Sequence, residues 1–481
     1  MSSSIAISVL DSMFKFPNLS PESGTSEGGG DTTCLAFFIS STKPSEGEGI
    51  KAVCDCTMML KMSFFRESAE IIRKDLEERG MKTDVLDSVI ECDKQWRELI
   101  EEGNRIRSER NEYSKLIGEA KKRGEDIGAH LKKMEGVKER LPEIELKTTE
   151  AARKRDEYRM RVPNVLEKEV PSGNDETGNV EIKKYGKTSD FDFDVKSHNE
   201  LLDITGSADL DRAAKISGRR FYFLTGAMAR MELALINYAI EHLTNNEFEL
   251  TIPPYVMNKE AYEGVVDLGD FEEVMYKIDE HDLYLIATSE HPLTARFKDE
   301  IIEPKKLPLK YCGLSTNFRR EVGAHGLSDR GIWRVHQFAK VEQVIICKPE
   351  DSKKMHEVIL QNAVKLFEGL EIPFRVVDIC KGDIGTVAAR KFDLEAWMPS
   401  VGKWKEIVSA SNCTSYQSVR LNMRYRTSEG TEFPHTLNAT AIATTRALAA
   451  IIENNQQSDG SVIVPKVLQK WMGNQKVIEV E

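Results

Sequence analysis

Hydrophobic residues recur at alternating steps of three and four in two stretches of the first third of the chain. This spacing, 3.5 residues on average, is typical of the seam of a coiled coil. Gly124 and Gly128 lie between the two stretches and predict a turn, so the two helices are expected to run antiparallel. Pro142 predicts a local bend in the second helix. The seam positions are Trp96, Leu99, Gly103, Ile106, Arg110, Tyr113 and Ile117, then Met134, Val137, Leu141, Ile144, Thr148, Ala151, Arg155 and Tyr158.

The outer faces of these two helices carry many lysines and arginines, with glutamates between them. One interpretation is a solvated surface with ion pairs between successive turns, which charge alone favours. The other is a lever whose basic tip contacts RNA phosphates. A long two-helix arm implies that something distant is bound.

A segment rich in Pro, Gly and Asn at 162–179 marks a domain boundary. The pattern beyond it favours an α+β body built on an antiparallel sheet. We therefore predict a helical arm at 62–165 and a second domain at 166–481. Helices are expected at 201–217, 225–244, 352–370 and 440–454, a loop at 432–438, and strands at 249–253, 274–277, 283–287, 309–317, 333–346, 374–378, 391–397 and 404–410.

The first 61 residues differ from the rest in being rich in Gly, Ser and Glu, as in SGTSEGGGDTT and KPSEGEG. Such a tract buries too little apolar surface to become ordered. It also lacks the basic region and long apolar run of a secretory signal. We predict that residues 1–61 are a disordered extension or reflect a start assigned too far upstream.

The composition narrows the class of protein. The chain has 67 Lys and Arg against 79 Asp and Glu, a formal net charge of -12. This argues against a protein that coats polyanions, although a local basic face would still bind RNA. The 8 cysteines form no C-x-x-C pair and no zinc spacing, which predicts reduced thiols in a cytoplasmic protein. No apolar run approaches the roughly 18 residues of a membrane span, so no membrane partner is expected.

Residues suited to chemistry are concentrated at 317–342, where the pattern predicts a strand, a loop and a second strand that begins at Trp333. An arginine fork suits phosphate or carboxylate, an aromatic ring suits a purine, and a carboxylate accepts from an amine. The alternative is an exposed sheet face with ordinary ion pairs. Four residues share one face of the second strand by their even spacing: Arg334, His336, Phe338 and Glu342.

This segment resembles motif 2 of the class II aminoacyl-tRNA synthetases, in the form that the seryl members carry. F-R-x-E, a loop and R-x-H-Q-F-x-K-V-E all match. The resemblance implies an ATP site and a serine site side by side. The implied roles are the α-phosphate and the serine carboxylate for Arg319, the adenine amino group for Glu321, adenine stacking for Phe338, the outer phosphates for Arg334, nucleotide contact for Arg320 and Val335, and serine binding for Glu342.

Residues 436–468 resemble motif 3 of the same family, and the resemblance implies that Arg446 contacts the γ-phosphate. The usual N-G-[ST]-G pattern is changed here, because Ala439 and Ala441 replace its glycines. Alanine disfavours a positive φ, so we expect ordinary backbone angles in this loop. Asn438 and Thr440 would then lie near the substrate serine. Without motif 2 beside it, this segment would be interpreted as an amphipathic helix.

Two shorter matches complete the implied site. Thr288, Ser289 and Glu290 resemble the T-x-E element that holds the amino acid. The tetrapeptide at 406–409 resembles the E-I-x-S strand. Its oxygen ligands would bind a Mg²⁺ ion that bridges the phosphates of ATP. The metal ligands implied are Glu406 and Ser409, and the tetrapeptide's ATP contacts are Glu406, Ile407, Val408 and Ser409.

The resemblance spans about 64–472 and implies an α+β class II catalytic domain preceded by the long antiparallel coiled-coil arm. Motif 1 falls at about 236–255, which implies a homodimer. The implied activity is a serine–tRNA ligase that converts ATP to AMP and pyrophosphate, with Arg319, Arg446 and Glu342 as catalytic residues. It would charge tRNA(Ser) and also tRNA(Sec). Two alternatives are a synthetase-like RNA-binding or regulatory protein without aminoacylation, and a class II relative that activates another amino acid.

Overall fold

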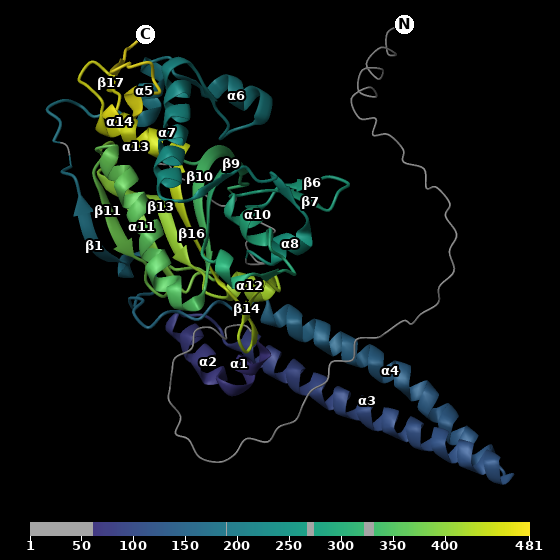
Figure 1. Ribbon diagram of the computed structural model, residues 1–481. Coiled ribbons are helices and arrows are strands. Elements are labelled where there is room, and N and C mark those ends of the chain that lie inside the picture. The colour runs from purple at the N-terminus through teal and green to yellow at the C-terminus, as the bar shows by residue number, and fades with distance from the viewer. Residues whose placement is uncertain (1–60, 189, 267–273, 322–330) are drawn as a thin grey trace, which may run out of the picture. The chain divides into compact units, whose positions relative to one another are not determined.

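The computed structural model describes residues 61–188, 190–266, 274–321 and 331–481 (Figure 1). The described residues belong to one compact unit, 54–481. The extension predicted at 1–61 lies outside them except for its last residue, so it stays a prediction. Within the described ranges, no helix is long and apolar enough to cross a membrane.

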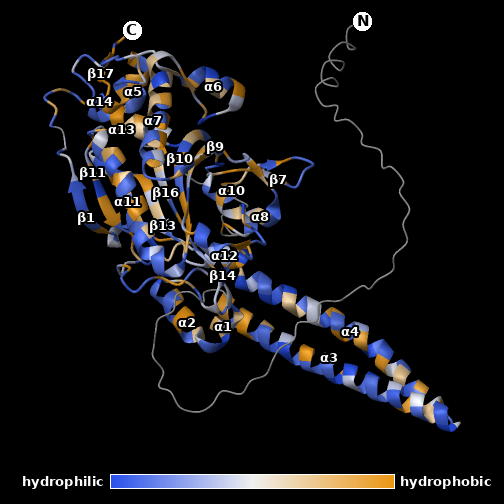
Figure 2. Ribbon diagram, in the orientation of Figure 1, coloured by the Kyte–Doolittle hydropathy of each residue, from blue (hydrophilic) through white to orange (hydrophobic). Residues whose placement is uncertain are grey.

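The arm consists of two long helices, α3 (Asp84–Arg123) and α4 (Gly128–Arg159), preceded by the short helices α1 (Met62–Glu67) and α2 (Ala69–Glu78). Gly124 ends α3 with φ 70°, a left-handed angle that glycine adopts without a steric penalty. Arg107 of α3 pairs with Glu145 of α4 at 3.0 Å, and Arg140 of α4 reaches back to Glu109. These pairings confirm the antiparallel hairpin. Both helices are largely hydrophilic in Figure 2, with apolar residues scattered along them.

Arg155, a seam position of the arm, lies beside a buried carboxylate that has several cationic partners. Asp93 is 2% exposed and accepts hydrogen bonds from Arg66 at 2.7 and 2.8 Å and from Arg97 at 3.1 Å. Arg155 lies 3.8 Å from the same carboxylate and stacks over the ring of Trp96. Arg155 therefore belongs to a charge cluster that joins α1, α3 and α4.

The body is built on an eight-stranded sheet in the order β1-β11-β12-β13-β16-β10-β9-β4, antiparallel except for the β4–β9 pair. The α+β fold class is therefore confirmed. Its strands are β1 (Val180–Tyr185), β4 (Glu249–Thr251), β9 (Leu309–Phe318), β10 (Gln337–Cys347), β11 (Phe374–Asp378), β12 (Arg390–Met398), β13 (Lys403–Asn412) and β16 (His435–Ala443). The smaller strands are β2 (Ala208–Asp209), β3 (Phe223–Leu224), β5 (Val256–Met257), β6 (Lys277–Ile278), β7 (Leu283–Leu285), β8 (Ile301–Ile302), β14 (Arg424–Thr427), β15 (Gly430–Glu432), β17 (Val462–Ile463) and β18 (Val477–Ile478).

The main core lies between one face of this sheet and helices that include α7, α11 and α13 (Figure 1). Successive side chains of a strand point to opposite faces. On β16, Ala439 and Ala441 are fully buried in this core, whereas Asn438 and Thr440 face the other way. The helices of the body are α5 (His198–Ile204), α6 (Leu210–Ser217), α7 (Gly226–Asn245), α8 (Lys259–Glu263), α10 (Glu290–Ala295), α11 (Ser352–Gly369), α12 (Tyr416–Arg420), α13 (Thr444–Asn454) and α14 (Lys466–Gln469).

Several predicted elements were wrong in extent. The strand expected at 274–277 is represented only by β6, which begins at Lys277. The helix expected at 201–217 is split into α5 and α6 by a turn at Gly206, with φ 54°, and by strand β2. The strand expected from Trp333 begins at Gln337. The loop at 432–438 and the helix from Thr440 were misplaced, because β16 continues to Ala443. Alternation of small apolar and polar residues in β16 was hidden by the high helix propensity of alanine.

Candidate active site

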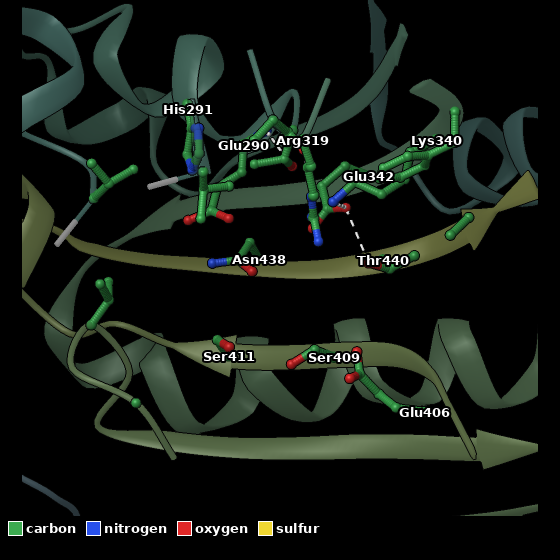
Figure 3. A pocket seen from close by; sticks show the side chains of 18 of the residues that line it. Glu290, His291, Arg319, Lys340, Glu342, Glu406, Ser409, Ser411, Asn438 and Thr440 are labelled. Carbon is green, nitrogen blue, oxygen red and sulfur yellow. Dashed lines mark hydrogen bonds and ion pairs between the residues drawn. The ribbon is translucent and has the colours of Figure 1, made fainter. Parts of the chain in front are cut away.

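The face of the sheet opposite the main core borders a cavity of about 430 Å³ (Figure 3). Strands β10, β13 and β16 contribute its central residues, with α10 and the segment 384–388 beside them. Fourteen residues predicted from the sequence line it: Thr288, Glu290, Arg319, Glu321, Arg334, Val335, Phe338, Glu342, Glu406, Ile407, Ser409, Asn438, Thr440 and Arg446.

Four residues that the sequence placed on the site do not line the cavity. Ser289 is fully buried and donates to the carbonyl oxygen of Gly313 at 3.2 Å. Val408 belongs to the main core, and Arg320 is exposed. His336 lies just before β10, where its Nδ1 is 2.8 Å from the carbonyl oxygen of Arg319. His336 therefore contacts the backbone of Arg319. It does not share a strand face with Phe338 and Glu342, because β10 starts one residue after it.

A β-bulge brings the two predicted metal ligands to one face. Residues three apart on a regular strand point to opposite faces. Val408 pairs with Leu394 and Glu406 with Glu395, so Ile407 is an extra residue without a partner on β12. A bulge of this kind re-aims side chains. Glu406 and Ser409 consequently both line the cavity.

The guanidinium of Arg446 lies 3.1 Å from Glu406 Oε1 and also donates to the Glu406 carbonyl oxygen. Burial raises the pKa of Glu406, but Arg446, Lys391 and Arg319 outweigh burial and leave this pKa below its ordinary value. The carboxylate is therefore ionised at neutral pH. Carboxylate and hydroxyl oxygens suit Mg²⁺, but Glu406 and Ser409 alone are an incomplete set of ligands. A cation held there needs further oxygens, such as those of phosphates.

Aromatic and cationic groups are paired at the other predicted nucleotide contacts. The guanidinium of Arg319 lies 5.2 Å from the centre of the Phe338 ring, and Arg334 lies 3.4 Å from Glu321. Glu321 has φ 46°, a left-handed angle that is rare outside glycine, and Arg220 donates to its carbonyl oxygen at 3.0 Å. Strained residues of this kind occur at ligand sites more often than elsewhere.

Two carboxylates face the cavity from different elements in Figure 3. Glu342 on β10 accepts from Lys340 Nζ at 2.6 Å and from the Thr440 hydroxyl at 3.3 Å. Glu290 at the start of α10 accepts from Gln417 at 2.9 Å. Burial, and then the charge of Glu342, raise the pKa of Glu290 to about 7. The pair can bind one cationic or hydroxyl-bearing ligand between them.

Sequence reasoning missed several residues of this site. Lys340 was part of the quoted motif and shares the even spacing of Phe338 and Glu342, so alternation could have identified it. His291 follows Glu290 directly, lines the cavity, and places Nδ1 3.2 Å from the Tyr262 hydroxyl. The segment 384–388 has no polar pattern that marks it as part of a site.

Comparison with known proteins places this geometry in a family context. A model described as the seryl-tRNA synthetase N-terminal domain matches residues 59–166, and one described as the tRNA synthetase class II core domain (G, H, P, S and T) matches 273–455. A serine–tRNA ligase from Methanospirillum hungatei is 49% identical over 425 residues, which are 87% of this chain and 100% of the relative.

Two solved structures are similar over most of the chain. Seryl-tRNA synthetase from Pyrococcus horikoshii, complexed with ATP, has a TM-score of 0.84 and 43% identity and covers 88% of this chain and 100% of its own. Cytoplasmic serine–tRNA ligase from Naegleria fowleri, in complex with AMP, has a TM-score of 0.80 and 34% identity, and covers 88% of this chain and 99% of its own.

Proposed function

The chain belongs to the seryl-tRNA synthetase family, and we propose that its cavity is where serine and ATP form seryl-adenylate and where the seryl group passes to tRNA(Ser). The enzyme class is an aminoacyl-tRNA ligase. The observation that carries the assignment of the site is the convergence of several arginines and two carboxylates, the buried Glu342 and the half-buried Glu290, in one cavity. Survival of this complete set argues against a relative that has lost aminoacylation.

We propose that serine binds between Glu290 and Glu342. Glu290, with Thr288 beside it, takes the ammonium group, and Glu342 and Thr440 take the hydroxyl. Thr440 donates to Glu342 at 3.3 Å, so the two polar groups lie side by side in the cavity. Alanine is rejected because it leaves these buried groups unpaired.

ATP binds across Arg319, Phe338 and Arg446 in this proposal. Adenine stacks on Phe338, with its amino group donating to Glu321, and Arg334 and Arg446 meet the outer phosphates. Glu406 and Ser409 would hold a Mg²⁺ ion through their oxygens, and that ion would supply charge neutralisation. Arg320, Ser289 and Val408 do not line the cavity, so their side chains have no direct role in binding the substrates in this proposal.

The reaction has two steps. A carboxylate oxygen of serine bonds to the α-phosphorus while the bond from that phosphorus to the bridging oxygen breaks, and pyrophosphate leaves. The terminal ribose hydroxyl of the tRNA then bonds to the seryl carbonyl carbon while the bond from that carbon to the phosphate oxygen breaks, so AMP leaves and the hydroxyl proton is released. Arg319 is placed to hold the serine carboxylate and the α-phosphate together, so positioning and charge stabilisation carry the chemistry.

Arg319→Ala tests this assignment. We expect serine-dependent exchange between ATP and pyrophosphate to fall by a factor of roughly 100 or more, as when a charge-stabilising donor is removed. Arg320→Ala is the matched control, because Arg320 is adjacent in sequence and does not line the cavity. Near-normal exchange in Arg319→Ala would refute the proposed site.

The arm is proposed to bind the tRNA. Removing residues 108–144 and closing the gap with a short glycine turn keeps Arg107 opposite Glu145 and leaves the Asp93 cluster intact. We expect normal ATP–pyrophosphate exchange and a loss of tRNA charging. Unchanged charging would favour a merely solvated arm.

Homodimer formation is proposed through the elements of the predicted motif 1. Leu233 on α7 is 59% exposed and Ile252, just after β4, is 65% exposed. Apolar side chains exposed on neighbouring elements are typical of an interface. Light scattering should report a dimer for the parent and a monomer for Leu233→Asp. A cytoplasmic location and the charging of tRNA(Sec) stay predictions.

A further inference from the structure

The cavity wall at 384–388 is held by residues far away in the sequence. This segment is irregular, and its residues line the cavity. Three consecutive carbonyl oxygens of the wall accept hydrogen bonds from two residues of the arm and its junction with the body. Arg79 Nη1 donates to Gly385 at 2.6 Å, Asn164 N to Thr386 at 2.8 Å, and Asn164 Nδ2 to Val387 at 2.9 Å.

The two anchoring residues are also tied to each other. Arg79 follows α2 and its side chain is 1% exposed. Its Nε donates to Asp75 at 2.9 Å, and its Nη2 donates to the carbonyl oxygen of Asn164. The second oxygen of Asp75 accepts from the backbone N–H of Leu166 at 3.1 Å. The guanidinium is thus shared between α2, the segment that follows the arm, and the cavity wall.

Burial gives this arrangement an electrostatic cost. It lowers the pKa of Arg79 and, although Arg79 opposes the effect, raises the pKa of Asp75. Apolar residues often stabilise such a position as well as a buried ion pair does. Stability alone is therefore a weak reason for this pair, whereas fixing the geometry of carbonyl oxygens requires a planar fork with several donors.

Asn164 connects the same junction to the serine end of the cavity. Its Nδ2 also lies 2.8 Å from the carbonyl oxygen of Cys413. Cys413 lines the cavity, and its sulfur accepts from Asn438 at 3.6 Å. The next residue, Thr414, has φ 45°, and its hydroxyl lies 3.1 Å from Asn164 Nδ2. A left-handed threonine persists only where its surroundings fix it.

We propose that Arg79 and Asn164 are positioning residues for serine binding. They fix the wall at 384–388 and the backbone of Cys413, and through these they set the shape of the pocket that receives the amino acid. This rests on the proposed function. The helices before the arm thereby do more than support tRNA binding, because they complete the activation site.

The test compares Arg79→Met with Arg73→Met in the full-length enzyme. Both residues belong to the same helical region, but Arg73 pairs with Asp87 at 2.7 Å and not with the wall. In Arg79→Met we expect the KM for serine in ATP–pyrophosphate exchange to rise roughly fivefold or more, the factor for one lost hydrogen bond. The KM for ATP should stay within about twofold of the parent value, because no anchor touches the nucleotide contacts. Arg73→Met should match the parent in both constants.

Asn164→Asp is the second variant, since it replaces the Nδ2 donor by an oxygen of the same shape. We expect the same selective rise in the serine KM, and this variant alone decides if Arg79→Met does not fold. Equal serine KM values for parent, Arg79→Met and Asn164→Asp would overturn the inference, as would equal rises for serine and ATP, which indicate general damage. If the parent shows no serine-dependent exchange, the proposed function itself fails.

Discussion

Lys340→Met should lower the stability of the fold and change the pH dependence of serine binding. Lys340 Nζ and Glu342 Oε2 are 2.6 Å apart, with side chains 6% and 2% exposed. Methionine keeps the volume of the side chain but removes its charge. Glu342 is then left with the Thr440 hydroxyl at 3.3 Å and with Glu290 as a like charge.

The magnitude follows from this separation. Unit charges 2.6 Å apart attract by about 6 kcal/mol at an effective dielectric of about 20, and desolvation of both groups offsets much of this. Removing one partner of a buried pair costs about 3–5 kcal/mol, because the other charge stays buried. Lys340 also lowers the pKa of Glu290, which stands at about 7 with Lys340 in place. Its loss raises that pKa, so Glu290 becomes neutral at a higher pH.

Two assays test these consequences. Urea denaturation should show a loss of about 3–5 kcal/mol in Lys340→Met. The pH below which the serine KM rises should move upward from near 7, because a protonated Glu290 no longer attracts the serine ammonium group. The double variant Lys340→Met, Glu342→Gln should regain stability without regaining serine binding, since a neutral amide needs no counter-charge. Lys305→Met is the exposed control.

A loss of stability below about 1 kcal/mol in Lys340→Met, together with an unchanged serine KM, would refute the reasoning. It would mean that the contact between Lys340 and Glu342 contributes little to folding, despite the separation of 2.6 Å and the 2% exposure of the Glu342 side chain.

Two further predictions concern the strand that carries Thr440. Burial lowers the pKa of His435 to about 4 from 6.5, so the unfolded state binds the extra proton between these values and stability is lost as pH falls. This withdraws about 2 kcal/mol between pH 7 and 5, and His435→Leu should remove that part of the pH dependence in urea denaturation at the two pH values. A parent and variant with parallel pH curves would contradict the shift. Ala439→Gly should cost about 1–2 kcal/mol on denaturation, from a lost buried methyl group and added chain entropy, with unchanged exchange kinetics. A changed serine KM would show that this side chain reaches the cavity.

The sequence predicted the arm well because its signals are local. The 3.5-residue seam and the glycines at the turn specify two helices and their direction without reference to the rest of the chain. The seam did not predict the charge cluster around Asp93 and Arg155. One member of that cluster, Arg66, comes from α1, which is not part of the coiled coil. A charge cluster built from different helices produces no periodic pattern in the sequence.

The site was predictable as a set of residues but not as a geometry. Glu406 and Ser409 are three apart, and regular alternation would have separated them, so only resemblance to a family grouped them. The bulge at Ile407 depends on how many residues of β12 pair with this part of β13, and that pairing is a property of the sheet and not of the local sequence. The wall at 384–388 was missed for another reason. It is held through three backbone carbonyl oxygens, and the identities of its side chains do not indicate such contacts.

Asp93 at the base of the arm has a consequence for ionic strength. Mobile ions screen exposed charges but enter buried pairs poorly. Asp93 and Arg155 are 2% and 12% exposed, whereas Lys121 and Lys122 at the far end of α3 are exposed. Contacts between such lysines and RNA phosphates weaken steeply with salt. Raising the salt should therefore release a bound tRNA while the Asp93 cluster at the base of the arm stays paired, so rebinding after dilution requires no rebuilding of that cluster.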